Sequence, residues 1–330
     1  MRVLVTGGTG FVGGFLVEEL LHRHYQVRCL VLEGEPLNSL QNLPVEIIYG
    51  NICQIDTLYQ SVQDVDYIYH LAAIKQSWDE TDFYRVNVEG TENLIRATLR
   101  SNNNLKKFLY VSTQAAVGPS QNGQILTEDA PCHPVDHYGK SKRATEELLL
   151  NQYTQLPTTI VRPASIYGPR NLGPSMTALV ISLTRWGIMP KIKPYGRSLH
   201  PIHVRDVVRG FILAAEKEQA TGQKYFLTNE EPCTWLDFAR LCFRIREQKG
   251  VLLPVPARVI KWWVGTVIYY RKITGRPYRG ITDQLQYLSF EHWLCSGEKA
   301  KQELGFEIRI PLVEGLKETI DWFDTRNGRS

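Results

Sequence analysis

The sequence predicts an α/β protein with a doubly wound parallel sheet and a smaller, discontinuous C-terminal lobe. Short β-branched runs alternate with helical patterns from residue 1 to about 165, which is typical of repeated strand–helix–strand units. Beyond about 165 the alternation loosens, and prolines and glycines punctuate the chain. Because 330 residues exceed what one hydrophobic core normally supports, we expect a first domain over 1–165 and a substrate lobe over most of 166–330.

Six runs in the first region are predicted as strands: Arg2–Val5, Val27–Leu32, Glu46–Tyr49, Tyr67–His70, Lys107–Val111 and Thr158–Val161. Apolar residues at helical spacing predict helices over Phe11–Arg23 and Val88–Leu99, with apolar faces that cover the sheet. A further strand, Lys224–Leu227, and an amphipathic helix, Val204–Ala215, indicate that a segment near 200–230 returns to the first domain.

Composition excludes several classes of protein. The chain is 43% apolar and 22% charged, which is close to the globular average and far from disorder. The net charge of +4 is not gathered into any run of five basic residues, so nucleic acid is not expected as a partner. Six scattered cysteines without a C-x-x-C pair indicate reduced thiols in the cytoplasm and no metal site.

The membrane relation of the chain depends on two stretches. A strand and glycines stand at residues 1–8, where a signal peptide would need its apolar segment, so we expect no export. The longest apolar stretch, around Val259–Tyr270, is interrupted by Lys261 and is shorter than the ~20 residues of a spanning helix. Its basic flanks allow peripheral membrane contact; alternatively, its aromatics pack on the substrate lobe or form a homodimer contact.

The strongest local motif is the run from Thr6 to Gly13, which follows the first strand and opens the first helix. Gly7 permits a tight turn, Gly10 lets the backbone approach a pyrophosphate, and Gly13 allows close packing of helix on strand. The free N–H groups of the helix then face the phosphates. This context predicts a dinucleotide site.

The choice between NAD and NADP depends on the end of the second strand. Glu33 lies there and can accept the ribose hydroxyls, and no Lys or Arg occurs from Cys29 to Ile74 to meet a 2′-phosphate. NAD is therefore favoured. If Glu33 belongs only to a solvated loop, Arg28 or a distant residue leaves NADP possible.

A second constellation is Tyr138 and Lys142, four residues apart and thus on one helix face. An ammonium next to a phenol lowers the pKa of the phenol, which suits proton transfer to or from an alcohol. Thr113, or Ser112, at the end of the fifth strand can hold the reacting oxygen. These residues predict catalysis at an alcohol or ketone.

The chain resembles the extended short-chain dehydrogenase/reductases, including the epimerases and dehydratases. The resemblance covers nearly the whole chain and is carried by these residues: Thr6–Gly13, His70–Ala73, Asn87–Thr91, Ser112–Thr113, Tyr138 with Lys142, Arg162–Pro163 with Tyr167–Pro169, His203–Asp206, and the closing segment from Trp293 to Trp322. It implies a Rossmann-type domain and a homodimer built on the long helices near Asn87 and Tyr138.

The resemblance also implies site residues. Thr113, Tyr138 and Lys142 are the expected catalytic residues, with Tyr138 as acid/base. The expected cofactor contacts are Gly7, Gly10, Phe11, Val12, Gly13, Glu33, Asn51, Ile52, Leu71, Ala72, Ala73, Lys75, Asn87, Tyr138, Lys142 and Pro163. Lys75 is equally compatible with a surface charge, and Asn87 with a helix cap.

Two departures from the sugar-nucleotide branch narrow the substrate. Ser165 and Leu199 stand where epimerases often carry Asn and Arg, although Arg197, Arg170 or Lys193 can substitute. Aromatics in Val255–Tyr270 favour an apolar substrate. We therefore expect an NAD(P)-dependent oxidoreductase that interconverts a secondary alcohol and a ketone, similar to the 3β-hydroxysteroid dehydrogenase and dihydroflavonol reductase branch. The alternatives are a nucleotide-sugar epimerase or dehydratase, and a non-catalytic NAD(P)-binding sensor or assembly factor.

Overall fold

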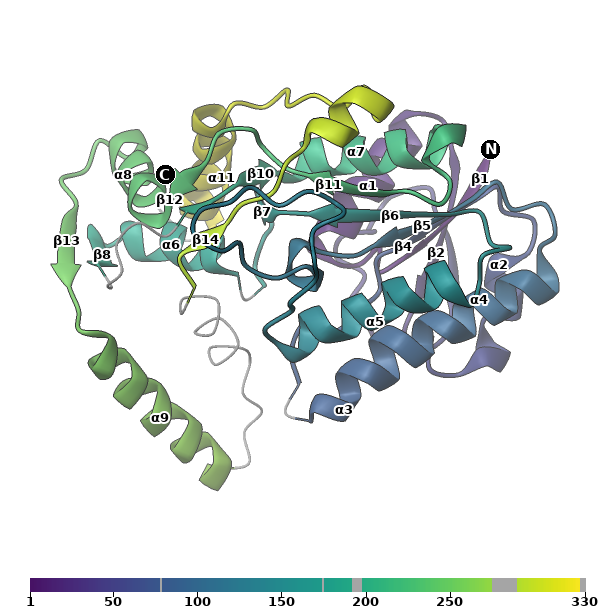
Figure 1. Ribbon diagram of the computed structural model, residues 1–330, viewed down its shortest axis with the longest axis horizontal. Helices are drawn as coiled ribbons and strands as arrows, with labels where there is room; N and C mark the ends of the chain where they lie inside the picture. Colours follow the sequence, from purple (N-terminus) through teal and green to yellow (C-terminus); the bar gives the residue numbers. More distant parts are fainter. Residues whose placement is uncertain (78, 174, 192–197, 275–289, 327–330) are drawn as a thin grey trace.

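The computed structural model describes residues 1–77, 79–173, 175–191, 198–274 and 290–326. A parallel sheet of seven strands lies at the centre of the larger part of the molecule (Figure 1), in the order β11-β6-β5-β4-β1-β2-β3. The strands are β1 (Arg2–Thr6), β2 (Gln26–Val31), β3 (Glu46–Tyr49), β4 (Tyr67–His70), β5 (Lys107–Val111), β6 (Thr158–Pro163) and β11 (Lys224–Leu227). All seven predicted strands are confirmed, with bounds that differ by at most two residues at either end.

The direction in which the chain adds strands reverses next to β1. From β1 the chain adds β2 and β3 on one side, and it then adds β4, β5, β6 and β11 on the other. Every neighbouring pair in this sheet is parallel. The carboxyl ends of the strands therefore meet at one edge, and the point between β1 and β4 is the switch point at which such sheets bind ligands.

Helices cover both faces of the sheet (Figure 1), so the predicted doubly wound architecture is confirmed. On one face lie α1 (Phe11–His22) and α7 (Val204–Glu216), which pack in one apolar cluster with β1 and β2. A second cluster joins the other face to α2 (Tyr59–Val62), α4 (Gly90–Ser101) and α5 (His137–Asn151). The buried sheet reads as continuous apolar runs because neither face meets water.

The C-terminal half builds a smaller region with its own apolar cluster. The helices of this cluster are α6 (Met176–Thr184), α8 (Trp235–Ile245) and α11 (Leu312–Arg326). Small sheets accompany them: β7 (Ser165–Tyr167) with β10 (Pro201–His203), β9 (Ser198–Leu199) with β12 (Cys233–Thr234) and β14 (His292–Trp293), and β8 (Ile188–Lys191) with β13 (Val251–Pro254). Between β9 and β12 the chain passes through α7 and β11 in the larger part. The domain boundary near residue 165 stays a prediction.

One helix stands apart from both regions. The 18 residues of α9 (Ala257–Thr274) follow β13 and extend away from the body of the molecule (Figure 1). In the parts of the chain that the structure describes, no helix is long and apolar enough to cross a bilayer.

Candidate active site

The predicted site residues gather along the carboxyl edge of the sheet. Gly7 follows β1, Leu71 follows β4, Thr113 follows β5, and Pro163 ends β6. Because these strands are neighbours in the sheet, their ends form one row on which a long ligand can lie. Glu33 and Asn51 follow β2 and β3 at the same edge.

The glycine turn after β1 is shaped by close backbone contacts. Gly7 has φ +72°, and a Cβ there would lie 2.9 Å from the backbone nitrogen of Ala72. A Cβ on Gly13 would lie 2.0 Å from the carbonyl oxygen of Gly7. A side chain at either position is therefore excluded, whereas a Cβ on Gly10 would meet only the carbonyl of Gly7, at 3.3 Å. The backbone at Gly10 is thus open to an approaching group.

The N-terminus of α1 offers unpaired N–H groups. The first helical hydrogen bond runs from the nitrogen of Gly14 to the oxygen of Gly10, at 2.9 Å, so the N–H groups of Phe11, Val12 and Gly13 have no partner inside the helix. No side chain caps this terminus, and no acidic residue lies in the first turn. Donors in this arrangement fit the pyrophosphate of a dinucleotide.

The helix α5, which carries Tyr138 and Lys142, begins at a capped first turn that contains a glycine. The Asp136 carboxylate accepts a hydrogen bond from the Gly139 nitrogen at 2.7 Å. A Cβ on Gly139 would lie 2.4 Å from the carbonyl oxygen of Ala115, in the turn η3 (Gln114–Ala116) that follows Thr113. The absence of a side chain at Gly139 therefore lets the first turn of α5 pack against the segment after β5.

Burial dominates the protonation of the Tyr138 and Lys142 pair. The pKa of Tyr138 is raised above its ordinary value, first by burial and then by the charge of Asp136. Burial lowers the pKa of Lys142 to about 7, although Glu146 opposes this. The structure thus differs from the predicted lowering of the tyrosine pKa by the lysine. The physical reason is that the same desolvation penalises both the phenolate and the ammonium.

Lys142 and Lys75 are two cations near the same edge. The Lys142 side chain is 1% exposed, and its Nζ atom lies 4.1 Å from the ring centroid of Tyr110. Lys75 keeps an exposed surface, yet the protein packed around it lowers its pKa, and its charge also lowers the pKa of Lys142. Lys75 is therefore close enough to α5 for its charge to act on Lys142.

Asn87 links the loop after β4 to α5. It lies in the π-helical turn η2 (Tyr84–Glu89), a geometry that is frequent at functional sites. Its side-chain amide donates to the carbonyl of Ile74 at 3.0 Å and to Ser141 Oγ at 2.9 Å, and its Oδ1 accepts from the Ile74 nitrogen at 2.9 Å. The side chain therefore acts as a brace between two segments of the site, and the alternative of a helix cap does not hold.

The contacts of several residues in this brace were not predicted from the sequence. Thr145 Oγ1 donates to the carbonyl of Asn87 at 3.0 Å, and Thr91 Oγ1 donates to the same carbonyl at 2.6 Å. Ser141 Oγ donates to the carbonyl of Tyr138 at 2.8 Å. The available signal was the four-residue spacing of Asn87 with Thr91 and of Ser141 with Thr145, which places each pair on one helix face.

His70 extends the brace to the glycine turn. Its Nδ1 lies 2.7 Å from Thr6 Oγ1 and its Nε2 lies 2.8 Å from Thr91 Oγ1. Because the Thr91 hydroxyl donates to Asn87, it accepts from His70, so the histidine carries its proton on Nε2 and accepts from Thr6. Burial lowers the pKa of His70 to about 3, and the charge of Lys142 contributes. The neutral ring thus joins β1, β4 and α4.

A buried ion pair holds α5 against β6. Arg162 and Glu146 have fully buried side chains and form two hydrogen bonds, of 2.9 Å and 2.6 Å. Ser112 Oγ donates to Glu146 at 2.6 Å. Ser112 is therefore held by Glu146, whereas Thr113 Oγ1 accepts a hydrogen bond from the Ala115 nitrogen at 3.2 Å.

The residues expected near the adenosine differ in their exposure to solvent. Glu33 is exposed just after β2. The Asn51 side chain accepts from the Cys53 nitrogen at 2.9 Å, so it caps its own turn. Ile52 is buried, and a Cβ on Gly90 would lie 2.9 Å from its side chain, which makes it a packing residue under α4.

Arg28 has no freedom to reach a 2′-phosphate. It is buried on β2, where its Nε donates to Glu46 at 2.9 Å and its Nη1 donates to three carbonyls, including that of Gln63 at 2.8 Å. The route to NADP through Arg28 is therefore closed in this structure.

Of the three cations that were expected to be able to bind the diphosphate of a sugar nucleotide, the structure describes only Arg170. Arg170 forms two hydrogen bonds with Glu18, at 2.6 and 2.8 Å, and its guanidinium lies 3.7 Å from the ring centroid of Phe15. It is thus held on α1. Arg197 and Lys193 lie outside the described residues.

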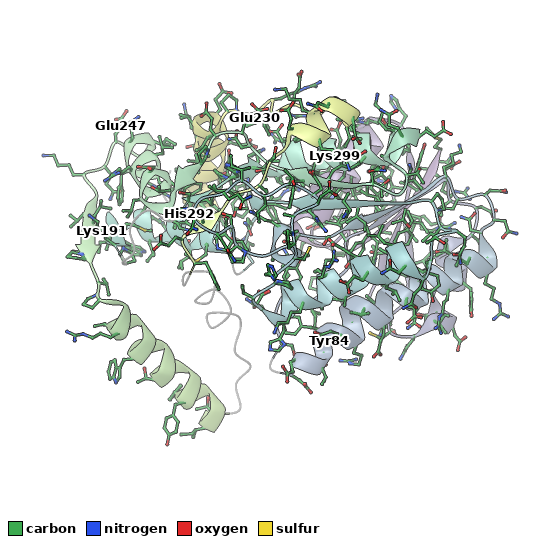
Figure 2. The ribbon with its side chains drawn as sticks, viewed as in Figure 1. Tyr84, Lys191, Glu230, Glu247, His292 and Lys299 are labelled. Carbon is green, nitrogen blue, oxygen red and sulfur yellow. The ribbon has the colours of Figure 1, made fainter. Side chains whose placement is uncertain are left out.

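Three aromatic side chains of the stretch Val255–Tyr270 are exposed, on a helix that stands clear of the body of the molecule (Figure 2). The side chains of Trp263, Val264 and Ile268 lie outside those that the structure describes. Trp262, Tyr269 and Tyr270 on α9 are 71%, 69% and 63% exposed. The expectation that these aromatics line a substrate pocket or pack on the lobe is therefore wrong for these three side chains, because the helix extends from the body (Figure 1).

Comparisons with known proteins agree with this arrangement. The model of the NAD dependent epimerase/dehydratase family matches residues 3–227. A putative dihydroflavonol 4-reductase of Synechocystis is 30% identical over 97% of this chain and 93% of its own. A 3 beta-hydroxysteroid dehydrogenase/Delta 5→4-isomerase of Mycobacterium tuberculosis is 31% identical over 98% of this chain and 90% of its own.

A solved structure shares the fold. The crystal structure of UDP-glucose 4-epimerase from Thermotoga maritima superposes with a TM-score of 0.81, at 24% identity over 99% of this chain and all of the other.

Proposed function

Because the chain belongs to the NAD-dependent epimerase/dehydratase family, we propose that it is an oxidoreductase that interconverts a secondary alcohol and a ketone with NAD. The observation that carries this proposal is the gathering of Thr113, Tyr138 and Lys142 at the same sheet edge as the glycine turn. The brace through Asn87 and His70 joins the two parts of this site.

NAD is the cofactor that the residues fit. The free N–H groups at Phe11 to Gly13 would hold the pyrophosphate, with the open backbone at Gly10 beside them. Leu71, Ala72 and Ala73 would line the adenosine side, and Pro163 would lie against the nicotinamide. When bound, NAD supplies the hydride acceptor or donor. Glu33 at the end of β2 favours NAD over NADP.

Tyr138 would exchange a proton with the reacting oxygen, which Thr113 would hold by a hydrogen bond. The raised pKa of Tyr138 keeps the phenol protonated, so the structure as it stands favours the donor role, towards the alcohol. Lys142, with a pKa of about 7, changes its charge near neutral pH and would contact the ribose when protonated. Lys75 would approach the cofactor from the loop after β4.

An apolar alcohol or ketone is the substrate class that we favour over a sugar nucleotide. The two sequence relatives are named for a flavonoid substrate and a steroid substrate. Ser165 and Leu199 lack the amide and guanidinium groups that hold a diphosphate, and Arg170 is engaged by Glu18. The exposed aromatics of α9 give no support to this choice.

The proposed function also includes an assembly and a compartment. The long helices α4 and α5 lie side by side on one face of the sheet (Figure 1), and they are the surface on which we place a homodimer. All six cysteines are free thiols, which suits the reducing cytoplasm.

The test is the replacement Tyr138→Phe. It should lower kcat by at least ~100-fold, the scale of general acid–base catalysis, while NAD affinity stays within a few-fold. The measurement is nicotinamide absorbance during turnover of a panel of steroid and flavonoid alcohols. Wild-type activity in the variant contradicts the mechanism. Isomerisation of a UDP-sugar without net absorbance change favours an epimerase instead, and NAD binding without turnover of either class favours a sensor.

A further inference from the structure

The helix α9 carries an apolar stripe that Thr266 interrupts midway along the helix. Counting about 100° per residue along an α-helix, Val259, Trp262, Tyr269, Tyr270 and Ile273 fall within one arc of roughly 100°. Each of these five side chains is exposed, from 47% at Val259 to 71% at Trp262. Exposed apolar stripes of this width are unusual on a helix that faces only water.

The side chains in the stripe are of the kind that lie at a bilayer surface. Trp and Tyr combine an apolar ring with a polar atom, and they are enriched where hydrocarbon meets the headgroup layer. The stripe places Trp262 and Tyr269 about two turns apart on α9, with Val259 and Ile273 nearer the two ends. One face of the helix can therefore enter the interface over most of its length.

The charge of the segment is entirely of one sign. Residues 248–274 contain five Lys or Arg and no Asp or Glu, whereas the whole chain has a net charge of only +4. The remainder of the chain is therefore slightly negative, and the positive charge is concentrated on and next to α9. Arg258 is exposed at the start of the helix, beside the stripe.

Further exposed apolar residues lie where α9 joins the body. Ile188 on β8 and Val251 and Leu253 on β13 are exposed, and Trp186 just before β8 is 72% exposed. These strands pair with each other in register, from Ile188 with Val251 to Lys191 with Pro254. Figure 1 places both strands and α9 at the same end of the molecule, with β13 leading into the helix.

We propose that α9 docks this protein on an anionic lipid bilayer, with the Trp262–Tyr269 stripe in the interface and the basic residues on the headgroups. A symmetric contact with a second copy of the chain is disfavoured, because it would bring two cationic segments without acidic residues against each other. This inference does not depend on the proposed activity.

The experiment is flotation of the full-length protein with vesicles of phosphatidylcholine, with and without phosphatidylglycerol. Wild type should float with the anionic vesicles, and its partition coefficient on the neutral vesicles should be lower by about tenfold or more. Added salt should lower binding to the anionic vesicles. The double variant Trp262→Glu with Tyr269→Glu should lower the partition coefficient by about 100-fold. Arg258→Glu should lower it by about fivefold or more, through charge alone.

A matched control uses an aromatic residue that is exposed far from α9. Tyr49→Glu on β3 changes the same kind of side chain and should leave vesicle binding unchanged. Thermal unfolding and NAD affinity measured on every variant separate loss of docking from loss of fold. Equal flotation of wild type and the double variant overturns the proposal, as does an α9-dependent dimer in sedimentation without any vesicle binding.

Discussion

The carboxyl edge of the sheet and the helix α9 make opposite use of polar and apolar side chains. At the sheet edge, the polar side chains of His70, Asn87 and Glu146 are buried, and each is hydrogen-bonded to a hydroxyl group, that of Thr91, Ser141 and Ser112 respectively. On α9, Trp262 and Tyr269 are large and mostly exposed. The edge is thus specified by contacts within the chain, whereas α9 presents a surface that none of the described residues covers.

The largest expected effect comes from breaking the buried ion pair behind the edge. Arg162→Leu leaves the Glu146 carboxylate buried without its bidentate partner. The free energy of unfolding should fall by about 3–5 kcal/mol, as measured by urea denaturation. The matched control is Arg240→Leu, since the pair with Asp237 is exposed; its cost should stay below about 1 kcal/mol. Similar losses in the free energy of unfolding for the two variants would contradict the expectation that the buried ion pair matters more than the exposed one.

The next effect concerns the pH dependence of stability at His70. Its pKa is lowered to about 3 in the folded protein from an ordinary value of 6.5, so below pH 6.5 the unfolded chain binds the extra proton. The contribution of the neutral His70 ring to the free energy of unfolding is therefore complete above pH 6.5, and it is lost as the pH falls towards 3. In His70→Gln, the decrease in the free energy of unfolding between pH 6.5 and about 4.5 should be smaller than in wild type by roughly 2 kcal/mol.

Urea denaturation at a series of pH values measures this effect. His22→Gln, at an exposed position on α1, is the control and should leave the slope of stability against pH unchanged. An unchanged slope in His70→Gln would show that other groups dominate acid unfolding.

A smaller effect is expected from the pair of lysines. The charge of Lys75 lowers the pKa of Lys142, so Lys75→Met should raise it. The limb of the pH–rate profile that reports Lys142 should then move upward by roughly half a pH unit. Lys75→Arg keeps the charge and should leave this limb in place. Movement of the limb in both variants would indicate a change of geometry rather than of charge.

The smallest effect is expected on α9. Trp262→Ser and Tyr269→Ser remove large side chains that are mostly exposed, so each should change the free energy of unfolding by less than about 0.5 kcal/mol. Thermal unfolding in the absence of lipid measures this. A cost above about 2 kcal/mol would show that these rings pack against protein in solution.

Strands and the glycine turn were predictable because their signals are local. Alternation of β-branched runs with helical patterns located all seven strands of the sheet, and the glycine spacing predicted the close contacts at Gly7 and Gly13 and the open backbone at Gly10. The parallel sheet then placed Thr113 and Pro163 at one edge, although neither is near Gly7 in sequence.

What could not be predicted depends on distances between segments far apart in the chain. The brace from Thr6 through His70 to Thr91 joins residues 64 and 21 positions apart. The protonation of Tyr138 follows from burial, which a single sequence does not quantify. Nor did the aromatic pattern of α9 indicate whether its rings face protein or solvent, since both kinds of helix share that pattern.

The strand β11 has a consequence for anyone who would express the cofactor-binding half separately. It forms the outer edge of the sheet beside β6, and α7 covers the apolar face of its neighbours, yet both come from beyond residue 200. A fragment that stops near residue 165 would lose both elements. The strand β6 would then be an exposed edge strand, and its unpaired backbone groups could form hydrogen bonds with strands of other molecules. Such a truncation is expected to precipitate, whereas an excision that keeps Pro201–Leu227 joined to the first half preserves the sheet.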